Sequence, residues 1–418
     1  MNNVRLDKAV SFQLSRFEGR IRGMSAPRRR TGGTGFAVGI ALLCSLTAAQ
    51  DSFSSRVAAL SEPGGYFNTD NLISNERSFL HVVPELRALS RQASTGGAYL
   101  GVGPDQNFSY IAHLRPSIAI IVDIRRDNLL LHLLFKAVFA EARTRVDYLA
   151  LLTGRPVPAP DAGWAQAGVD KIVNYIETAP PLSAGRIAAL RARLTRTIDG
   201  FGVPISAAER TTIDRFHRRF IADGLALRFN TTGRAPQIDY PDYRDLLLER
   251  DLQGVRQSFM ATEESFQFVK SLQSRDLVIP IVGNLAGPTA LAAVGRFLTA
   301  SNRKISVVYT SNVEFYLFRE GSFATFVENL GRLPRQPGSL VVRSVFPSGG
   351  TGLALRPGYN SVSLTQPIQT MLDGYGKGSF RQYRDLVGRF RQRSERARPF
   401  PPEPPLPQGS VRLLKTAQ

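Results

Sequence analysis

Short apolar segments that alternate with helical patterns constrain the fold of this chain more than any other sequence feature. Each segment is followed by turn residues and then by a helical pattern. The five segments are residues 98–103, 117–124, 277–284, 304–311 and 339–346. Apolar runs of this kind are typical of strands buried on both faces, and their alternation with helices is typical of parallel strands joined by right-handed crossovers. The sequence therefore predicts an α/β protein built on a parallel sheet.

A long helical stretch separates the second of these segments from the third. Over residues 128–273, apolar side chains recur at spacings of three and four positions, which is the period of amphipathic helices. Prolines break this stretch into pieces, at positions 156, 158, 160, 180 and 181. Because the strand-like segments resume after it, we expect one α/β domain, residues 51–395, with a large helical insertion at 128–273.

The two ends of the chain lack the pattern of a folded domain. Arg28, Arg29 and Arg30 precede "GFAVGIALLCSLTAA", an apolar run of 15 residues, which is short for a membrane span but normal for the core of a signal peptide. Residues 1–50 therefore predict a targeting segment and export to the periplasm or the medium, with no stable membrane span after cleavage. The alternative is a spurious signal and a cytoplasmic protein. Residues 396–418 are proline-rich and basic, which predicts a disordered tail.

Charge and cysteine content argue against several function classes. The formal net charge of +19 is concentrated near the two ends and no nucleic-acid-reading motif is visible, so specific nucleic-acid binding is not expected. The single cysteine, Cys44, lies in the apolar N-terminal run, which leaves the expected domain without disulfides or thiol chemistry. The histidines lack a second ligand at helical or hairpin spacing, so no metal site is expected. They are His81, His113, His132 and His217.

The first two segments carry the sequence pattern of a nucleotide site. Gly101 and Gly103 end the first expected strand and precede a helix, so the backbone can turn sharply and a ligand can approach it. Asp123 closes the next strand about 20 residues later, where a carboxylate can hold ribose hydroxyls. Pro104 lacks a backbone N–H donor and the third glycine of the dinucleotide motif is missing, which disfavours a pyrophosphate. The alternative interpretation of the two glycines is an ordinary strand-to-helix turn.

The stretch "GVGP" together with Asp123 resembles the first two motifs of Rossmann-type S-adenosylmethionine-dependent methyltransferases. The resemblance implies a Rossmann-like fold, S-adenosylmethionine as the cofactor and methyl transfer to an unknown acceptor. It also implies that Asn284 lies near the adenine. Longer runs, among them "YLGVGPDQNFSYIAHLRP" and "IPIVGNLAGPTALAAVG", resemble a family of uncharacterised bacterial proteins with a methyltransferase-like core across most of residues 60–383.

The chain departs from the methyltransferase pattern at three places. Tyr99 stands two residues before the first glycine, where an acid is usual, and Asp105 replaces a common third glycine. No clear closing hairpin follows Phe346. These departures bear on catalysis more than on fold.

Polar residues near the expected strand ends complete the candidate site. The candidate cofactor-binding residues are Gly101, Gly103, Asn107, Asp123 and Asn284. The candidate substrate-side residues are Asp70, Asn75, Glu76, Arg125, Ser311, Asn312 and Glu314. Three alternatives stay open: Asn107 contacts the sheet in place of a ligand, Arg125 pairs with Asp127 or Glu141 in place of an acidic substrate, and Ser74 caps a helix in place of a cleft-lining segment.

Two function classes remain open on the sequence alone. The first is an S-adenosylmethionine-dependent methyltransferase, whose chemistry requires positioning and desolvation more than a catalytic dyad or a metal. The second is a non-catalytic exported or cell-envelope protein that retains the Rossmann-like fold. S-adenosylmethionine is made and kept in the cytoplasm, so the export signal and the methyltransferase activity argue against each other.

Overall fold

The computed structural model describes the chain from Ser52 to Gly388, apart from a few short gaps. The described residues are 52–92, 97–160, 163–232, 237, 239–346 and 353–388. The expected targeting segment, with Cys44, and the expected tail lie outside these residues. No helix in the described ranges is both long and apolar enough to cross a membrane.

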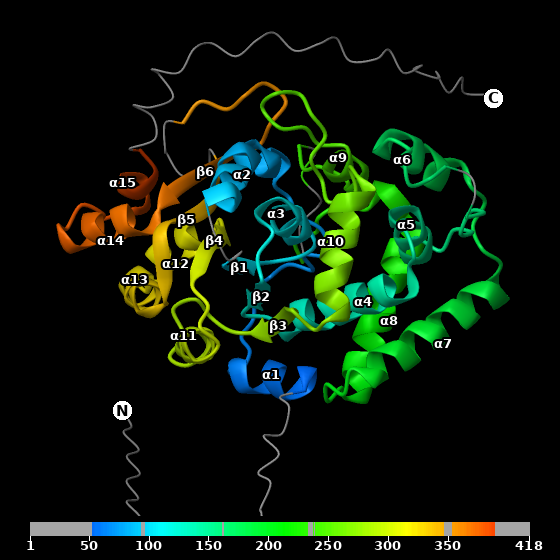
Figure 1. Ribbon diagram of the computed structural model, residues 1–418, viewed down its shortest axis with the longest axis horizontal. Helices are drawn as coiled ribbons and strands as arrows, with labels where there is room; N and C mark the ends of the chain where they lie inside the picture. The colour runs from blue at the N-terminus through cyan, green and yellow to red at the C-terminus, as the bar shows by residue number, and fades with distance from the viewer. Residues whose placement is uncertain are drawn as a thin grey trace, which may run out of the picture. The chain divides into compact units, whose positions relative to one another are not determined.

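A six-stranded sheet forms the centre of the domain, with the strand order β3-β2-β1-β4-β5-β6 (Figure 1). The strands are β1 (Ala98–Val102), β2 (Ile118–Asp123), β3 (Val278–Val282), β4 (Ile305–Ser311), β5 (Arg335–Val345) and β6 (Val362–Pro367). The first five run parallel, as the sequence predicts, and their order is that of the doubly wound α/β fold. The domain is therefore a mixed α/β structure compatible with a Rossmann-like fold.

The last strand, β6, is an addition that the sequence did not indicate. It pairs antiparallel with β5 at the edge of the sheet, and the two form the strand pair that the sequence did not reveal after Phe346. Its sequence, "VSLTQP", is half polar and only partly buried, so it lacks the apolar pattern that marked the other five strands. At the opposite edge, β3 contains Pro280, which an edge strand tolerates because one side of its backbone needs no ladder partner.

Helices cover both faces of the sheet, and Figure 1 shows α3 and α10 on one side and α11 and α13 on the other. The helices before and after β1 are α1 (Phe53–Leu60), α2 (Val83–Gln92) and α3 (Gln106–Leu114), with a 3₁₀ helix η1 (Arg77–Val82). Those after β3 are α11 (Ala290–Ala300), α12 (Val313–Arg319), α13 (Phe323–Arg332), α14 (Ile368–Gly376) and α15 (Tyr383–Val387).

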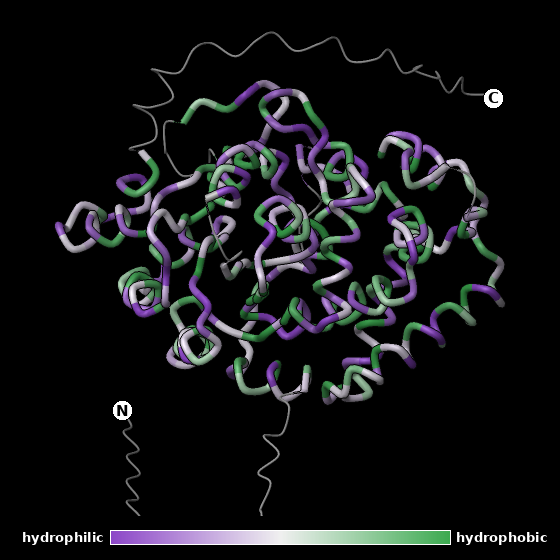
Figure 2. Tube along the Cα trace, viewed as in Figure 1, coloured by the Kyte–Doolittle hydropathy of each residue, from purple (hydrophilic) through white to green (hydrophobic). Residues whose placement is uncertain are grey.

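The connection from β2 to β3 carries the helices expected over 128–273, which confirms that prediction. They are α4 (Arg126–Glu141), α5 (Arg145–Leu152), α6 (Val169–Thr178), α7 (Ala184–Gly200), α8 (Ala207–Asp223), the 3₁₀ helix η2 (Gly224–Ala226), α9 (Tyr243–Leu247) and α10 (Glu263–Ser274). Hydrophobic and hydrophilic residues alternate along α7 in Figure 2, and its Leu190, Leu194 and Ile198 are buried. Exposed arginines of this helix form ion pairs, for example Arg193 with Glu141 at 2.7 Å.

Candidate functional site

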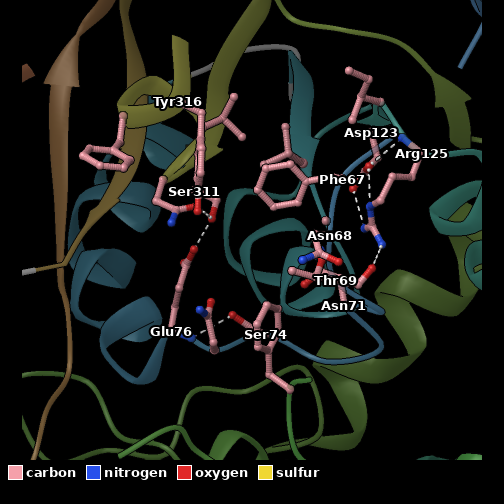
Figure 3. Close-up of a pocket in the computed structure, with 18 of the residues that line it drawn as sticks. Phe67, Asn68, Thr69, Asn71, Ser74, Glu76, Asp123, Arg125, Ser311 and Tyr316 are labelled. Carbon is pink, nitrogen blue, oxygen red and sulfur yellow. Dashed lines mark hydrogen bonds and ion pairs between the residues drawn. The ribbon is translucent and has the colours of Figure 1, made fainter. Parts of the chain in front are cut away.

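A cavity of about 920 Å³ opens at the carboxyl ends of β1, β2, β3 and β4. In the sheet, β1 lies between β2 and β4, so the chain leaves β1 toward one edge and returns to its other side. Ligands of open α/β sheets bind at such a switch point, and the volume is within the range of small-molecule sites. Figure 3 shows one group of lining residues around Asp123 and Arg125 and another around Glu76 and Ser311.

The turn after β1 brings Gly103 to the cavity. Gly103 has φ +84°, a conformation that a side chain would strain. Its carbonyl oxygen accepts hydrogen bonds from Asn107 Nδ2 at 3.3 Å and from His132 Nε2 at 2.9 Å. Burial lowers the pKa of His132 to about 4, so its ring is neutral near pH 7 and the nitrogen that faces the carbonyl carries the proton. Two side chains thus hold the turn in one conformation.

Gly101 and Asn107 support this turn and are not among the described residues that line the cavity. Asn107 is fully buried, donates to the carbonyl of Pro104 at 2.7 Å and accepts from the hydroxyl of Tyr99 at 2.7 Å. A Cβ atom on Gly101 would lie 2.1 Å from Asn107 Oδ1. The structure therefore gives these two residues contacts within the protein in place of the ligand contact that the sequence suggests. It also explains Tyr99, whose hydroxyl orients the Asn107 amide.

Asp123 lies beside the glycine turn, and its carboxylate forms an ion pair with Arg125. Since Val102 is in register with Val122, the turn and the carboxylate end adjacent parallel strands. Asp123 Oδ1 accepts from Arg125 Nε at 3.1 Å and Oδ2 from Arg125 Nη2 at 3.0 Å, and both side chains are about one-tenth exposed. Oδ1 also accepts from the backbone N–H of Arg125 at 2.9 Å. The two oxygens of a carboxylate offer about four acceptor positions, so one position, on Oδ2, remains for a hydroxyl donor of a ligand.

Arg125 also ties the N-terminal segment to the rim of the cavity. Its Nη1 donates to the carbonyl of Thr69 at 3.0 Å and to that of Asp70 at 3.3 Å. The partner of Arg125 is thus Asp123, and neither of the two acids considered from the sequence. The guanidinium therefore contacts the carboxylate through Nε and Nη2 and the N-terminal segment through Nη1.

Glu62 anchors the start of the same segment at β3, a role that the sequence did not reveal. Its carboxylate accepts from the backbone N–H groups of Asn284 at 2.7 Å, Thr289 at 3.0 Å and Ala290 at 2.9 Å, at the start of α11. Partial burial raises the pKa of Glu62, but these hydrogen bonds together hold it below its ordinary value. The residues that follow, up to Glu76, pass along the cavity and supply part of its lining.

The remaining sequence candidates divide into cavity residues and structural residues. Asn75, Asn284 and Asn312 line the cavity, as do Ser74 and Ser311. Ser74 Oγ accepts from the backbone N–H of Glu76 at 3.1 Å, so it shapes the turn before η1 while lying at the cavity.

Asp70 and Glu314 are engaged elsewhere and are not among the described lining residues. Asp70 accepts from the backbone N–H of Asn230 at 3.3 Å, and burial raises its pKa. Glu314 forms a buried ion pair with Arg343, with distances of 2.5 and 3.1 Å and both side chains at most 1% exposed. The structure thus gives both acids a structural role in place of the substrate contact suggested by the sequence.

Glu76 lies at the other end of the cavity from Asp123 (Figure 3), and only 1% of it is exposed. Its Oε2 accepts from the hydroxyls of Tyr309 and Ser344, both at 2.5 Å, and its Oε1 accepts from the hydroxyl of Ser311. Burial raises the pKa of Glu76 above its ordinary value, against the opposing effect of these hydrogen bonds. Ser311 has φ +52°, an uncommon conformation for a residue with a side chain.

Aromatic side chains form much of the cavity wall. They are Tyr66, Phe67, Phe229, Tyr240, Phe315, Tyr316, Phe346 and Tyr383. Phe67 and Tyr316 meet edge to face, with ring centroids 4.9 Å apart. The faces of aromatic rings attract cations. Among the described residues that line the cavity, the positively charged ones are only Arg125 and Arg319. The wall therefore suits a planar or cationic group better than a polyphosphate. No group of three or more metal-ligating side chains is placed to hold a metal ion within the described ranges.

The fold is a mixed α/β structure with a mostly parallel sheet, compatible with a Rossmann-like fold, and a cavity of small-molecule size opens at the carboxyl ends of its strands. The chain matches a protein family described as a domain of unknown function (DUF7790) over residues 72–158 and 231–376, more than half of its length, and it belongs to that family. The matched ranges include Glu76, Gly103 and Asp123. No curated protein matches the chain.

Proposed function

We propose that the cavity binds S-adenosylmethionine and that the protein transfers its methyl group to a small acceptor. The observation that carries this proposal is that the Gly103 turn and Asp123 end adjacent parallel strands and line one cavity. Neighbouring strands are about 5 Å apart, so a turn and a carboxylate in this arrangement can contact opposite ends of a ribose.

Two features of the turn after β1 support this ligand over a dinucleotide. Pro104 withholds a backbone N–H donor at the turn, and buried Asp105 places a carboxyl group at the start of α3, where a pyrophosphate would otherwise bind. The antiparallel pair of β5 and β6 supplies the closing strand pair that the resemblance to methyltransferases calls for. The two features of the turn weigh against a phosphate-bearing cofactor, and the strand pair supports a methyltransferase-like core.

The chain's own residues would then bind and orient the ligands. Asp123 accepts a hydrogen bond from a ribose hydroxyl at the open position on Oδ2. Gly103 allows the ligand to approach the backbone, and Asn284 lies on the adenine side. The aromatic wall excludes water from the reacting groups. When bound, S-adenosylmethionine supplies an activated methyl group, so the protein needs to contribute mainly position and a dry environment.

One observation favours a second candidate, a non-catalytic protein that keeps the fold. Arg125 engages both oxygens of Asp123, so this carboxylate has a structural partner even without a ligand. Under this alternative the ion pair holds the N-terminal segment, and the cavity has no cofactor.

Titration calorimetry with S-adenosylmethionine and S-adenosylhomocysteine distinguishes the two candidates. We expect the wild-type protein to bind both, and Asp123→Asn to weaken binding about tenfold or more, because a charge-assisted hydrogen bond to ribose contributes about 1.5–3 kcal/mol. The control is Asp127→Asn, the same change at a half-exposed carboxylate of α4 that is not among the described cavity residues. Urea unfolding of each variant verifies that it folds. If the wild-type protein binds neither ligand at about millimolar concentration, the cofactor proposal fails and the non-catalytic alternative is the better account.

A further inference from the structure

The Glu76 end of the cavity has hydrogen-bond acceptors that the protein leaves partly unused. Of the roughly four acceptor positions on a carboxylate, the three hydroxyl donors fill three, two of them on Oε2. The open position is on Oε1, the oxygen that faces Ser311, and Ser311 lines the cavity. A donor in the cavity can therefore reach this carboxylate.

A second acceptor lies close by, on Gln106. Its Nε2 donates to the hydroxyl of Tyr309 at 3.1 Å, which in turn donates to Glu76. Its Oε1 is buried and has no hydrogen-bond partner among the described residues, although Gln106 lines the cavity and is 6% exposed. A buried amide oxygen without a partner is costly, and a ligand with an N–H donor would remove that cost.

The charge at this end is also uncompensated within the described part of the chain. The partners of Glu76 there are the neutral hydroxyls of Tyr309, Ser311 and Ser344, and no described cation forms an ion pair with it. By contrast, Asp123 and Glu314 each have an arginine partner. Aromatic rings that attract cations line the same cavity, among them Phe315 and Tyr383.

We propose that the Glu76 end of the cavity is the acceptor subsite and that it binds the ammonium group of an organic amine, held by Glu76 and Gln106 between aromatic rings. This inference rests on the proposed function, because it assigns the amine the role of methyl acceptor. In the transfer, Glu76 takes one proton from the ammonium, and the freed nitrogen lone pair forms the bond to the methyl carbon while the sulfur–carbon bond breaks and leaves its electron pair on sulfur. Burial raises the pKa of Glu76, which suits a group that must accept a proton.

The test uses phenethylamine as the probe, because it joins an ammonium group to an aromatic ring, and 2-phenylethanol as its uncharged analogue of similar shape. We expect calorimetry to detect phenethylamine binding to the full-length wild-type protein, with at least about tenfold weaker binding of the alcohol. Glu76→Gln keeps the shape but removes the charge, so it should abolish the preference for the amine. The control is Glu85→Gln, the same substitution at an exposed residue of α2 that is not among the described cavity residues.

Titrations with S-adenosylhomocysteine separate failure of this inference from failure of the proposed function. We expect phenethylamine to bind whether or not S-adenosylhomocysteine is present, and Glu76→Gln to retain S-adenosylhomocysteine binding within about threefold. If the wild-type protein binds S-adenosylhomocysteine but does not prefer the amine over the alcohol, the acceptor assignment is overturned while the cofactor proposal stands. Mutually exclusive binding also overturns it, since Glu76 would then serve the amino group of the cofactor. If the amine preference is present but S-adenosylhomocysteine does not bind, the proposed methyl transfer fails, and only an amine-binding site remains.

Discussion

The two ends of the cavity hold a carboxylate each, and the protein treats the two differently. At one end, Arg125 pairs with both oxygens of Asp123 and continues to the carbonyls of residues 69 and 70. At the other, Glu76 is more deeply buried but has only hydroxyl partners among the described residues. Hydroxyls donate hydrogen bonds without neutralising the charge.

This difference separates a carboxylate whose charge is paired within the protein, Asp123, from one whose charge has no counter-charge among the described residues, Glu76. Removing one partner of a buried ion pair leaves an uncompensated charge, so the Asp123 end should be sensitive to substitution. Burying a carboxylate without a counter-charge destabilises the ligand-free protein. The stability of the fold should therefore tolerate loss of the charge of Glu76. The contributions of the two ends to stability should also change with pH in opposite directions, because His132 supports the glycine turn at the Asp123 end and Glu76 is itself the titrating group at the other end.

The largest effect is expected from Arg125→Met. The substitution leaves the buried Asp123 carboxylate without its ion-pair partner and removes the hydrogen bonds to the carbonyls of residues 69 and 70. The free energy of unfolding should therefore fall by about 3–5 kcal/mol in urea denaturation. Arg126→Met is the matched control: Arg126 is the next residue, its side chain is 39% exposed, and its partner is Glu209. The control should cost no more than about 1 kcal/mol. Equal losses in the two variants would contradict the structural role assigned to Arg125.

An intermediate effect is expected on acidification, at the end that contains the glycine turn. The pKa of His132 falls from 6.5 to about 4 on folding, because burial penalises the charged ring. A lowered histidine pKa stabilises the fold above pH 6.5, and this contribution is lost as the pH falls through about 4. Its full size is about 3 kcal/mol. His132→Gln retains an N–H donor but does not titrate. Its free energy of unfolding, relative to that of the wild type, should therefore rise by about 2–3 kcal/mol as the pH falls from about 7 to about 4. A constant difference between the two proteins would exclude this role for His132.

The smallest effect is expected for the stability of Glu76→Gln. The raised pKa of Glu76 means that the folded protein is penalised as the pH rises through that pKa, the reverse of the His132 case. The titratable side chains that act on Glu76 include Tyr99, Tyr110 and Tyr309, whose own pKa values are raised by burial, so they stay neutral. In urea unfolding at about pH 5, the free energy of unfolding of the variant should be within about 1 kcal/mol of the wild-type value. At about pH 8 the variant should be the more stable of the two by a larger margin than at about pH 5. A loss at the higher pH would show that the ionised carboxylate stabilises the fold.

The sequence by itself determined the elements that local patterns encode. Apolar runs located five strands, amphipathic spacing located the helices between 128 and 273, and the glycines with Asp123 placed a turn beside a carboxylate. These predictions succeeded because side-chain periodicity and backbone preferences act over a few residues. The polar strand β6 was missed for the same reason, since only its pairing with β5 identifies it as a strand.

Only the tertiary structure decided which polar groups meet. Glu62 reaches Ala290, 228 positions away, and Glu76 reaches Ser344, 268 positions away. In the same way, Asn107 supports the glycine turn. Its amide nitrogen donates to the carbonyls of Gly103 and Pro104, and its amide oxygen accepts from the hydroxyl of Tyr99. A buried charge or amide is stabilised by whichever partner the packed chain brings within hydrogen-bonding distance, and that partner depends on how distant elements pack, which no local pattern records.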